Sequence, residues 1–244
     1  MIDKNNWAVI IPLANEAKNF NVFIDELKKV FDSLQSGKAY LVVDKNSKDN
    51  TVELCKNLSL LDARFITVWA SENKNVVDAY LRGYKEAFAN NHEFIIEMDA
   101  GMSHQPKAIP VFLNLLYDGY ECVFGSRFMK GGSMEDSSLY RKLLSRGGTV
   151  LANILLGTKQ TDMTSGYQGF HRNVVGELIK YPLKSKAHFY QTEVRYLLRK
   201  RKYVETPIHY KTASPTVSNK AILNSFFVLT FYFFQRIFSV PAEL

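Results

Sequence analysis

Residues 7–16 read WAVIIPLANE, and this stretch decides the fold. The apolar run 7–12 is typical of a strand covered on both faces, and it ends abruptly in polar residues. From Phe20 to Leu34 the apolar residues then recur at helical spacing, which predicts an amphipathic helix. A buried strand followed directly by a helix is the repeating unit of α/β proteins.

The same alternation continues outward along the chain. Further strands are expected at 40–43, 65–68, 94–98 and 122–124, and helices at 51–58, 76–89 and 106–117. Beyond Arg127 the pattern predicts a loop at 127–140, a helix at 141–156, irregular chain at 162–170, a helix at 191–199 and a strand at 203–210. The fold class is therefore α/β, with a mostly parallel sheet and helices on both faces.

Composition limits the class of function. The chain has 244 residues and a net charge of +7, which favours anionic partners without choosing among them. Nucleic acid is disfavoured because no basic helix or RNP-like aromatic pattern occurs, and an NAD-binding fold is disfavoured because no GxGxxG follows the first strand. Cys55 and Cys122 suggest neither a disulfide framework nor zinc, and no secretory signal is recognised, so a reduced cytosolic setting is expected.

Polar residues follow each of four expected strands. Asn15 and Glu16 follow the first, the segment 44–51 the second, Asp99 the fourth and Arg127 the fifth. Singly, each residue is explained as a strand terminator or a helix cap. In an open α/β sheet, however, ligands bind beyond the carboxyl ends of the strands. Taken together, these strand ends favour a nucleotide site.

An ordered series of short motifs resembles the GT-A glycosyltransferases of family 2, and within it the dolichol-phosphate mannose synthases and other polyprenyl-phosphate glycosyltransferases. The matching segments span about residues 7–220: Pro12–Glu16 (P-x-x-N-E), Val42–Thr51, Met98–Pro106 (M-D-A-x-x-S-H-x-P), Gly125–Phe128 with Gly131-Gly132, Arg141 with Ser145, Asp162–Tyr167, Phe189–Glu193 and Glu205–Ile208. The series is far more specific than any one motif.

The resemblance implies a GT-A (Rossmann-like) sheet and inverting transfer from a UDP- or GDP-linked sugar. It assigns six residues to the nucleotide-sugar: Pro12, Asn15, Glu16, Asp44, Ser47 and Asp99. Catalytic roles fall to Asp99, Arg127 and Glu193, although Glu193 also has an alternative structural role. The implied acceptor is a polyprenyl phosphate.

Five residues resemble those that grip the acceptor phosphate: Ser126, Arg127, Arg141, Ser145 and Lys220. Arginine suits this task through its planar fork, while the alternative is that these are solvated surface charges. A phosphate is already ionised at neutral pH and needs little general-base help, whereas a hydroxyl acceptor needs a positioned carboxylate such as Glu193.

Two departures from the family pattern concern charge. Lys45 replaces the second aspartate of a D-D pair, and Gly101 replaces the second aspartate of D-x-D. The resemblance implies a divalent metal ion, Mg²⁺ or Mn²⁺, near Asp99, which neutralises diphosphate charge. With Gly101 supplying no carboxylate, we expect weak metal binding that depends on the donor. The alternative is that Lys45 or another cation partly replaces the metal ion.

The end of the chain is expected to be distinct. Residues 1–218 form the expected glycosyltransferase domain, and residues 219–244 an apolar helical tail that falls short of a membrane span. The tail is either buried against the domain or a second copy, giving a possible homo-oligomer, or it lies at a membrane surface or against a membrane protein. The enzyme is then peripheral at the cytoplasmic face. Two other functions stay open: transfer to a saccharide hydroxyl, and a non-catalytic homologue that binds nucleotide-sugar or lipid.

Overall fold

The computed structural model describes residues 4–135, 137–211, 219–238 and 242–244. Its strands are β1 (Trp7–Leu13), β2 (Lys38–Val43), β3 (Phe65–Trp69), β4 (Phe94–Glu97), β5 (Cys122–Ser126), β6 (Gln168–His171) and β7 (Tyr203–Pro207). Its helices are α1 (Phe20–Leu34), α2 (Thr51–Leu61), α3 (Val76–Ala89), the 3-10 turn η1 (Pro106–Ala108), α4 (Ile109–Tyr117), α5 (Leu139–Leu156), α6 (Arg172–Leu178), α7 (Tyr190–Leu197) and α8 (Asn219–Phe238). The expected alternation of strands and helices is confirmed.

The strands form one sheet in the order β3-β2-β1-β4-β6-β5-β7. β1 pairs in parallel with β2 and β4, and β5 pairs in parallel with β7, so these strands end at a common edge. β6 runs antiparallel to both β4 and β5. The expectation of irregular chain at 162–170 is therefore wrong for its last three residues. The sequence Gln-Gly-Phe-His does not show the alternation typical of a strand. One of its positions is Gly169, and the Phe112 and Leu116 side chains of α4 fill the space that a side chain there would take.

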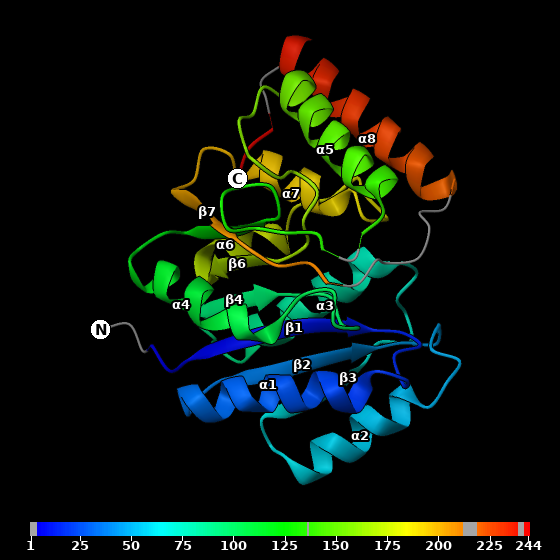
Figure 1. The fold of residues 1–244 in the computed structure, drawn as a ribbon, viewed down its shortest axis with the longest axis vertical. Helices are drawn as coiled ribbons and strands as arrows, with labels where there is room; N and C mark the ends of the chain where they lie inside the picture. Colours follow the sequence, from blue (N-terminus) through cyan, green and yellow to red (C-terminus); the bar gives the residue numbers. More distant parts are fainter. Residues whose placement is uncertain (1–3, 136, 212–218, 239–241) are drawn as a thin grey trace.

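Helices cover both faces of the sheet, as expected (Figure 1). One core contains α1, α2 and α4, and it includes the ring contacts of Phe31 with Trp7 and Phe65. The other contains α3, α6 and α7. Helix α6 is missing from the sequence expectation because seven residues are too few to display a periodic apolar pattern.

α5 and α8 lie side by side, away from the sheet (Figure 1). Together with α7 they bury a third cluster that includes Leu156, Tyr196, Val228 and Tyr232. The guanidinium of Arg236 donates to the carbonyl oxygens of Ile154 and Leu155 at 3.3 and 2.9 Å. A cation at the carboxyl end of α5 is favourable because the last carbonyls of a helix lack intrahelical partners.

α8 has the length and composition of a membrane-crossing helix. Residues Lys220–Phe238 have a mean hydropathy of 1.4, and only 22% of the most apolar window is buried. The expectation that the tail falls short of a span therefore does not hold by these two criteria. Length and composition are weak evidence for a span, however, and α8 also packs along α5.

Candidate active site

Three polar segments meet at the carboxyl edge of β2, β1 and β4. β1 lies between its two parallel neighbours, with Leu13 paired to Val43 and Ile10 paired to Glu97. Asp44 therefore follows β2 on one side of the β1 end, and Asp99 follows β4 on the other. This is the edge at which open α/β sheets bind ligands.

The loops after β1 and β2 are joined by hydrogen bonds. Asn15 adopts the left-handed conformation with φ 60°. Its backbone N donates to Ser47 Oγ at 3.1 Å, and its side-chain oxygen accepts from the backbone N of Lys48 at 2.8 Å. The backbone N of Ala17 donates to Asp49 at 3.0 Å. Asn15 and Ser47 therefore hold the loop shape, and direct contact of either with a nucleotide stays a prediction.

Asp44 and Pro12 line the end of this pair of strands. Asp44 is buried, and its Oδ1 accepts from the backbone N of Asn46 at 2.8 Å, which fixes the carboxylate at the start of the loop. Pro12 is half-buried in register with Val42. Lys45, which replaces the usual aspartate, is exposed. Contact of Asp44 with base or ribose stays a prediction.

Asp99 is held in a short turn after β4. Tyr80 donates its hydroxyl to Asp99 Oδ1 at 2.5 Å, and the backbone N of Asp99 donates to His104 Nδ1 at 2.9 Å. Burial lowers the pKa of His104, so its ring is neutral, with Nδ1 accepting. The 3.8 Å separation of Nδ1 from Asp99 Oδ2 is therefore not an ion pair. The carboxylate stays about one-third exposed, at 34%, and accessible to a ligand.

A buried hydrogen-bonded group, which we call the tyrosine cluster, lies beneath Asp99. It consists of Tyr80, Tyr84, Tyr190, Glu97 and Gln168. Tyr84 and Tyr190 donate to one oxygen of Glu97, and Gln168 donates to the other. Tyr80 stacks on Tyr190 at 5.4 Å. Burial raises the pKa of Glu97 to about 7, despite three hydrogen bonds that favour its charged form.

Sequence reasoning assigned no role to the tyrosine cluster. One signal was available: Glu97 interrupts the apolar run Phe94–Met98, and a charged residue in a doubly covered strand requires partners. The partners of Glu97 lie on α3, β6 and α7. Because these elements are far apart in the sequence, local sequence patterns could not predict the contacts.

Glu16 and Gly101 lie against each other on the exposed side of Asp99. Gly101 has φ +76°, and a Cβ placed there would lie 2.8 Å from Glu16 Oε2. Burial, followed by the charges of Asp99 and Asp49, raises the pKa of Glu16. Within the described ranges, no group of three or more His, Cys, Asp or Glu residues is arranged to hold a metal ion. The carboxylates available near this position are those of Asp99 and Glu16.

Arg127 is engaged in a buried ion pair. Its Nε donates to Asp162 Oδ2 at 2.7 Å, and its Nη2 donates to Asp162 Oδ1 at 2.9 Å and to Thr164 at 2.5 Å. Both residues are almost fully buried, and each holds the other in its charged form: the pKa of Arg127 is raised and that of Asp162 lowered despite the cost of burial. The fork that was expected to grip an acceptor phosphate is occupied by Asp162, and a direct phosphate contact stays a prediction.

The other expected acceptor residues are divided between the end of β5 and the helices α5 and α8. Ser126 is buried, and its hydroxyl bonds to Thr161 at 2.6 Å, which gives it a structural role in the loop. Arg141 lies in the first turn of α5, where Ser138 caps the helix, and Ser145 lies half-buried one turn further. Lys220 is exposed in the first turn of α8.

Glu193 has the contacts of a structural carboxylate. It is fully buried and accepts from the backbone N of Lys184 and Ser185, at 2.7 and 2.8 Å, and from the Tyr232 hydroxyl at 2.7 Å. These bonds join α7, the preceding loop and α8. They favour the alternative structural role of Glu193 over that of a general base.

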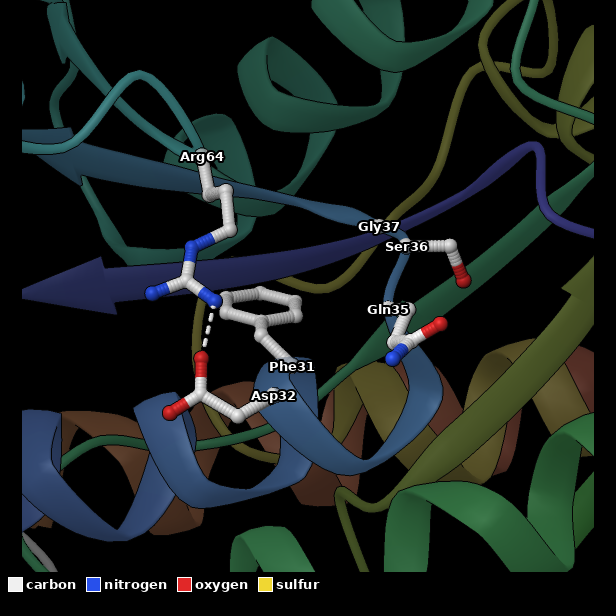
Figure 2. Close-up of a pocket in the computed structure, with 6 residues that line it drawn as sticks. All are labelled: Phe31, Asp32, Gln35, Ser36, Gly37 and Arg64. Atoms are coloured by element: carbon white, nitrogen blue, oxygen red, sulfur yellow. Dashed lines mark hydrogen bonds and ion pairs between the residues drawn. The ribbon is translucent and has the colours of Figure 1, made fainter.

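A hollow of about 390 Å³ lies at the opposite edge of the sheet. Gly37 and Arg64, which line it, immediately precede β2 and β3. Arg64 points toward Asp32 across the Phe31 ring (Figure 2). It also forms an ion pair with Asp62. Because this arginine is already neutralised and the hollow faces away from Asp44 and Asp99, it is not the nucleotide site.

Comparison with known proteins identifies the relatives of the chain. The sequence pattern of "Glycosyl transferase family 2" matches residues 8–179. Polyprenol monophosphomannose synthase of Mycolicibacterium smegmatis is 28% identical over 205 residues, covering 83% of this chain and 76% of the relative. Undecaprenyl-phosphate mannosyltransferase of Micrococcus luteus is 27% identical over 203 residues, covering 82% of each. Dolichol-phosphate mannosyltransferase of Pyrococcus furiosus is 33% identical over 172 residues, covering 69% of this chain and 47% of the relative, so the match spans about half of that protein.

Solved structures of glucosyl-3-phosphoglycerate synthase from Mycobacterium tuberculosis share the fold. The complex with Mn²⁺, UDP and glucosyl-3-phosphoglycerate superposes with a TM-score of 0.67 at 14% identity, covering 95% of this chain and 79% of that one. The complex with Mn²⁺, UDP and phosphoglyceric acid gives a TM-score of 0.66 at 15% identity, with coverage of 95% and 78%. The GT-A fold expected from the motifs is confirmed.

Proposed function

This chain belongs to glycosyl transferase family 2, and from that premise we propose that it transfers a sugar from a nucleotide-activated donor to the phosphate of a polyprenyl phosphate. Three curated relatives whose names specify polyprenol, undecaprenyl phosphate or dolichol phosphate support this acceptor class. The donor is a UDP- or GDP-linked sugar, in keeping with the anionic ligand that a chain of net charge +7 favours.

The observation that carries the lipid acceptor is the exposed surface of α5 and α8. Both helices expose apolar side chains along their length. The two helices lie side by side, away from the sheet (Figure 1). We call this surface the apolar face; its residues are Leu139, Tyr140, Leu143, Leu144, Val150, Leu151 and Ile154 of α5, and Ile222, Leu223, Phe226, Phe227, Phe231, Phe234, Ile237 and Phe238 of α8. Apolar patches of this extent are rare on soluble monomers and mark interaction surfaces.

The donor side of the proposed site consists of Pro12, Glu16, Asp44 and Asp99, with Asn15 and Ser47 holding the loops. Asp99 would hold a divalent metal ion, which would supply positive charge to neutralise the donor diphosphate as it departs. Tyr80 and His104 orient the Asp99 carboxylate and its backbone, so its position is fixed before the donor binds.

On the acceptor side, Arg141, Ser145 and Lys220 bind the lipid phosphate. Arg141 and Ser145 occupy successive turns at the start of α5, and Lys220 begins the adjacent α8. Arg127 contributes by holding Asp162 and the 161–167 loop in place. Because the phosphate acceptor is ionised at neutral pH, no general base is required, which is consistent with a Glu193 carboxylate enclosed in the interior.

The enzyme works at a membrane surface, on the cytoplasmic face, with the apolar face turned toward the lipid. Basic residues at the start of the face, Arg141, Lys142, Arg146 and Lys220, suit anionic headgroups. In a homo-oligomer, α8 would bury the same side chains against a second copy of the chain. Measuring the oligomeric state without lipid therefore distinguishes this role from membrane binding.

Transfer to an extractable lipid tests the proposal. The purified full chain is incubated with radiolabelled GDP-mannose, UDP-glucose and related donors, together with polyprenyl phosphate or the matching polyprenol. Label is expected in the organic phase only with the phosphate. Asp99→Asn should lower the rate roughly ten- to a hundredfold, since a charge-assisted contact contributes on the order of 1.5–3 kcal/mol. Equal transfer to the alcohol, or transfer only to a saccharide hydroxyl, would contradict it.

A further inference from the structure

A side chain at Gly101 would strain the backbone and displace the Glu16 carboxylate. Its φ is +76° and that of Met102 is 69°, so both residues lie in the left-handed region. A Cβ at Gly101 would lie 2.8 Å from Glu16 Oε2 and 3.2 Å from Oε1. Contacts under 3.0 Å are essentially absent for real Cβ atoms. The Glu16 carboxylate therefore fills the space in which an aspartate at position 101 would begin.

Glu16 is held there from the neighbouring loop. Its backbone N donates to Thr51 Oγ1 at 2.8 Å. Asp49 is already satisfied, because it accepts from Thr51, Ser47 and the backbone N of Ala17. The half-buried Glu16 carboxylate, by contrast, accepts no hydrogen bond from any residue in the described part of the chain, and it lies beside the charge of Asp99. Asp99 accepts a hydrogen bond from Tyr80, so Glu16 is the carboxylate of the two that lacks a donor. A cation between the two carboxylates would offset the repulsion of their charges.

We infer that Glu16 supplies the second carboxylate of the metal site, in place of the aspartate that Gly101 lacks. The inference rests on the proposed function in that the metal binds together with a nucleoside diphosphate. Mg²⁺ and Mn²⁺ prefer oxygen ligands, and at phosphate sites they use one or two carboxylates, phosphate oxygens and water. Asp99 and Glu16 meet that need, whereas Asp99 alone gives a weak site.

Mn²⁺ binding tests the inference without measuring transfer. Free Mn²⁺ is followed by electron paramagnetic resonance during titration of the full chain, in the presence of UDP and, separately, GDP. Glu16→Gln keeps the side-chain size and removes the charge, so its affinity for Mn²⁺ should fall roughly tenfold or more, the loss expected when a contact of about 1.4 kcal/mol disappears. Glu53→Gln, an exposed carboxylate in the first turn of α2, is the matched control and should bind as the wild type does.

A carboxylate swap makes the test specific. Gly101→Asp alone should not strengthen Mn²⁺ binding, because the new side chain meets Glu16 and strains the backbone. Glu16→Ala combined with Gly101→Asp removes the collision and moves the carboxylate to the other loop. This double variant should regain most of the Mn²⁺ affinity that Glu16→Ala loses. Thermal melting identifies any variant that fails to fold. If the double variant does not fold, the Mn²⁺ affinity of Glu16→Gln still tests the inference.

Three results would overturn the inference. If Glu16→Gln binds Mn²⁺ with the affinity of the wild type, Glu16 is not a ligand of the metal ion. If Glu16→Gln lost as much affinity for UDP and GDP in EDTA as it lost for Mn²⁺, Glu16 would contact the nucleotide itself and not the metal ion. Absence of Mn²⁺ binding by the wild type with either nucleotide would mean that the site holds no metal. Lipid transfer is measured separately, so a metal-independent transferase would refute this inference and leave the proposed function standing.

Discussion

Residue by residue, the carboxylates at the strand edge divide into exposed and buried groups with different tasks. Asp99 and Glu16 remain accessible to a ligand, while Glu97, Asp162 and Glu193 are enclosed and fully hydrogen-bonded. A buried carboxylate needs such donors because desolvation disfavours its charge. The three buried groups hold α7, α3 and the 161–167 loop in register behind the site.

The pH dependence of stability should carry the signature of Glu97. Its pKa rises from 4.5 to about 7 on folding. Between these values the unfolded chain releases the proton and the folded chain keeps it, so this contribution to stability is full below pH 4.5 and is lost as pH rises to about 7. The loss is on the order of 3 kcal/mol. Glu97→Gln should flatten the difference between urea unfolding at pH 5 and pH 8.

The control for that prediction is Glu53→Gln, which removes an exposed carboxyl outside the tyrosine cluster and should keep the wild-type difference between the two pH values. An unchanged difference in Glu97→Gln would mean that the cluster holds Glu97 with an ordinary pKa.

The two arginines of the acceptor side should behave differently when replaced. Arg127→Ala leaves Asp162 buried without its partner and should lower the free energy of unfolding by about 3–5 kcal/mol. Arg141 lies half-buried in the first turn of α5, so Arg141→Ala should lower stability much less than Arg127→Ala does and should raise the KM for polyprenyl phosphate. Denaturant unfolding and kinetics with varied lipid separate the two effects. Loss of donor affinity in Arg141→Ala would remove Arg141 from the acceptor site.

Among the elements, α5 and α8 have the least covered surfaces. They bury a few side chains against each other and α7, and many of their large apolar residues are exposed. A helix apolar on its outer side requires lipid or a partner. The Arg236 bonds to the end of α5 make the pair one structural unit.

Charged substitutions on the apolar face should abolish vesicle binding. Leu143→Glu with Phe227→Glu places a carboxylate on each helix, and sedimentation with phosphatidylglycerol vesicles should fall to the level seen without lipid. The matched control is Leu60→Glu with Leu61→Glu on α2, two leucines that are 85% and 86% exposed but lie outside the face. If Leu143→Glu with Phe227→Glu still binds vesicles, a surface other than the apolar face binds the membrane. If the wild type sediments as a dimer without lipid, the apolar face mediates self-association.

For the whole molecule, net charge and apolar surface make separable contributions to membrane attachment. The charge of +7 attracts anionic lipid over roughly 10 Å at 0.1 M salt and about 3 Å at 1 M. Binding to phosphatidylglycerol vesicles should therefore weaken several-fold as salt rises to 1 M. The binding that remains at 1 M salt should be similar to that of phosphatidylcholine vesicles, since apolar insertion is not screened and does not require anionic lipid. Complete release by salt would mean that attachment is electrostatic alone.

The sequence by itself determined the α/β alternation and the GT-A family, and it predicted the edge of the sheet at which we propose the site. These features depend on local periodicity and on short motifs of neighbouring residues, such as Pro12–Glu16 and Met98–Pro106. Strand boundaries needed little correction, because apolar runs in a doubly covered sheet end where polar residues begin. It also identified Gly101 as a missing carboxylate.

Only the tertiary structure decided which partners these residues have. Arg127 meets Asp162 across 35 positions, Glu97 meets Tyr190 across 93, and the Glu16 carboxylate lies against Gly101 from a different loop. The antiparallel strand β6 likewise forms because β4 and β5 present edges to it, whatever its own weak pattern. Such contacts depend on how distant segments pack, and burial then fixes whether a charged side chain serves a ligand or the interior.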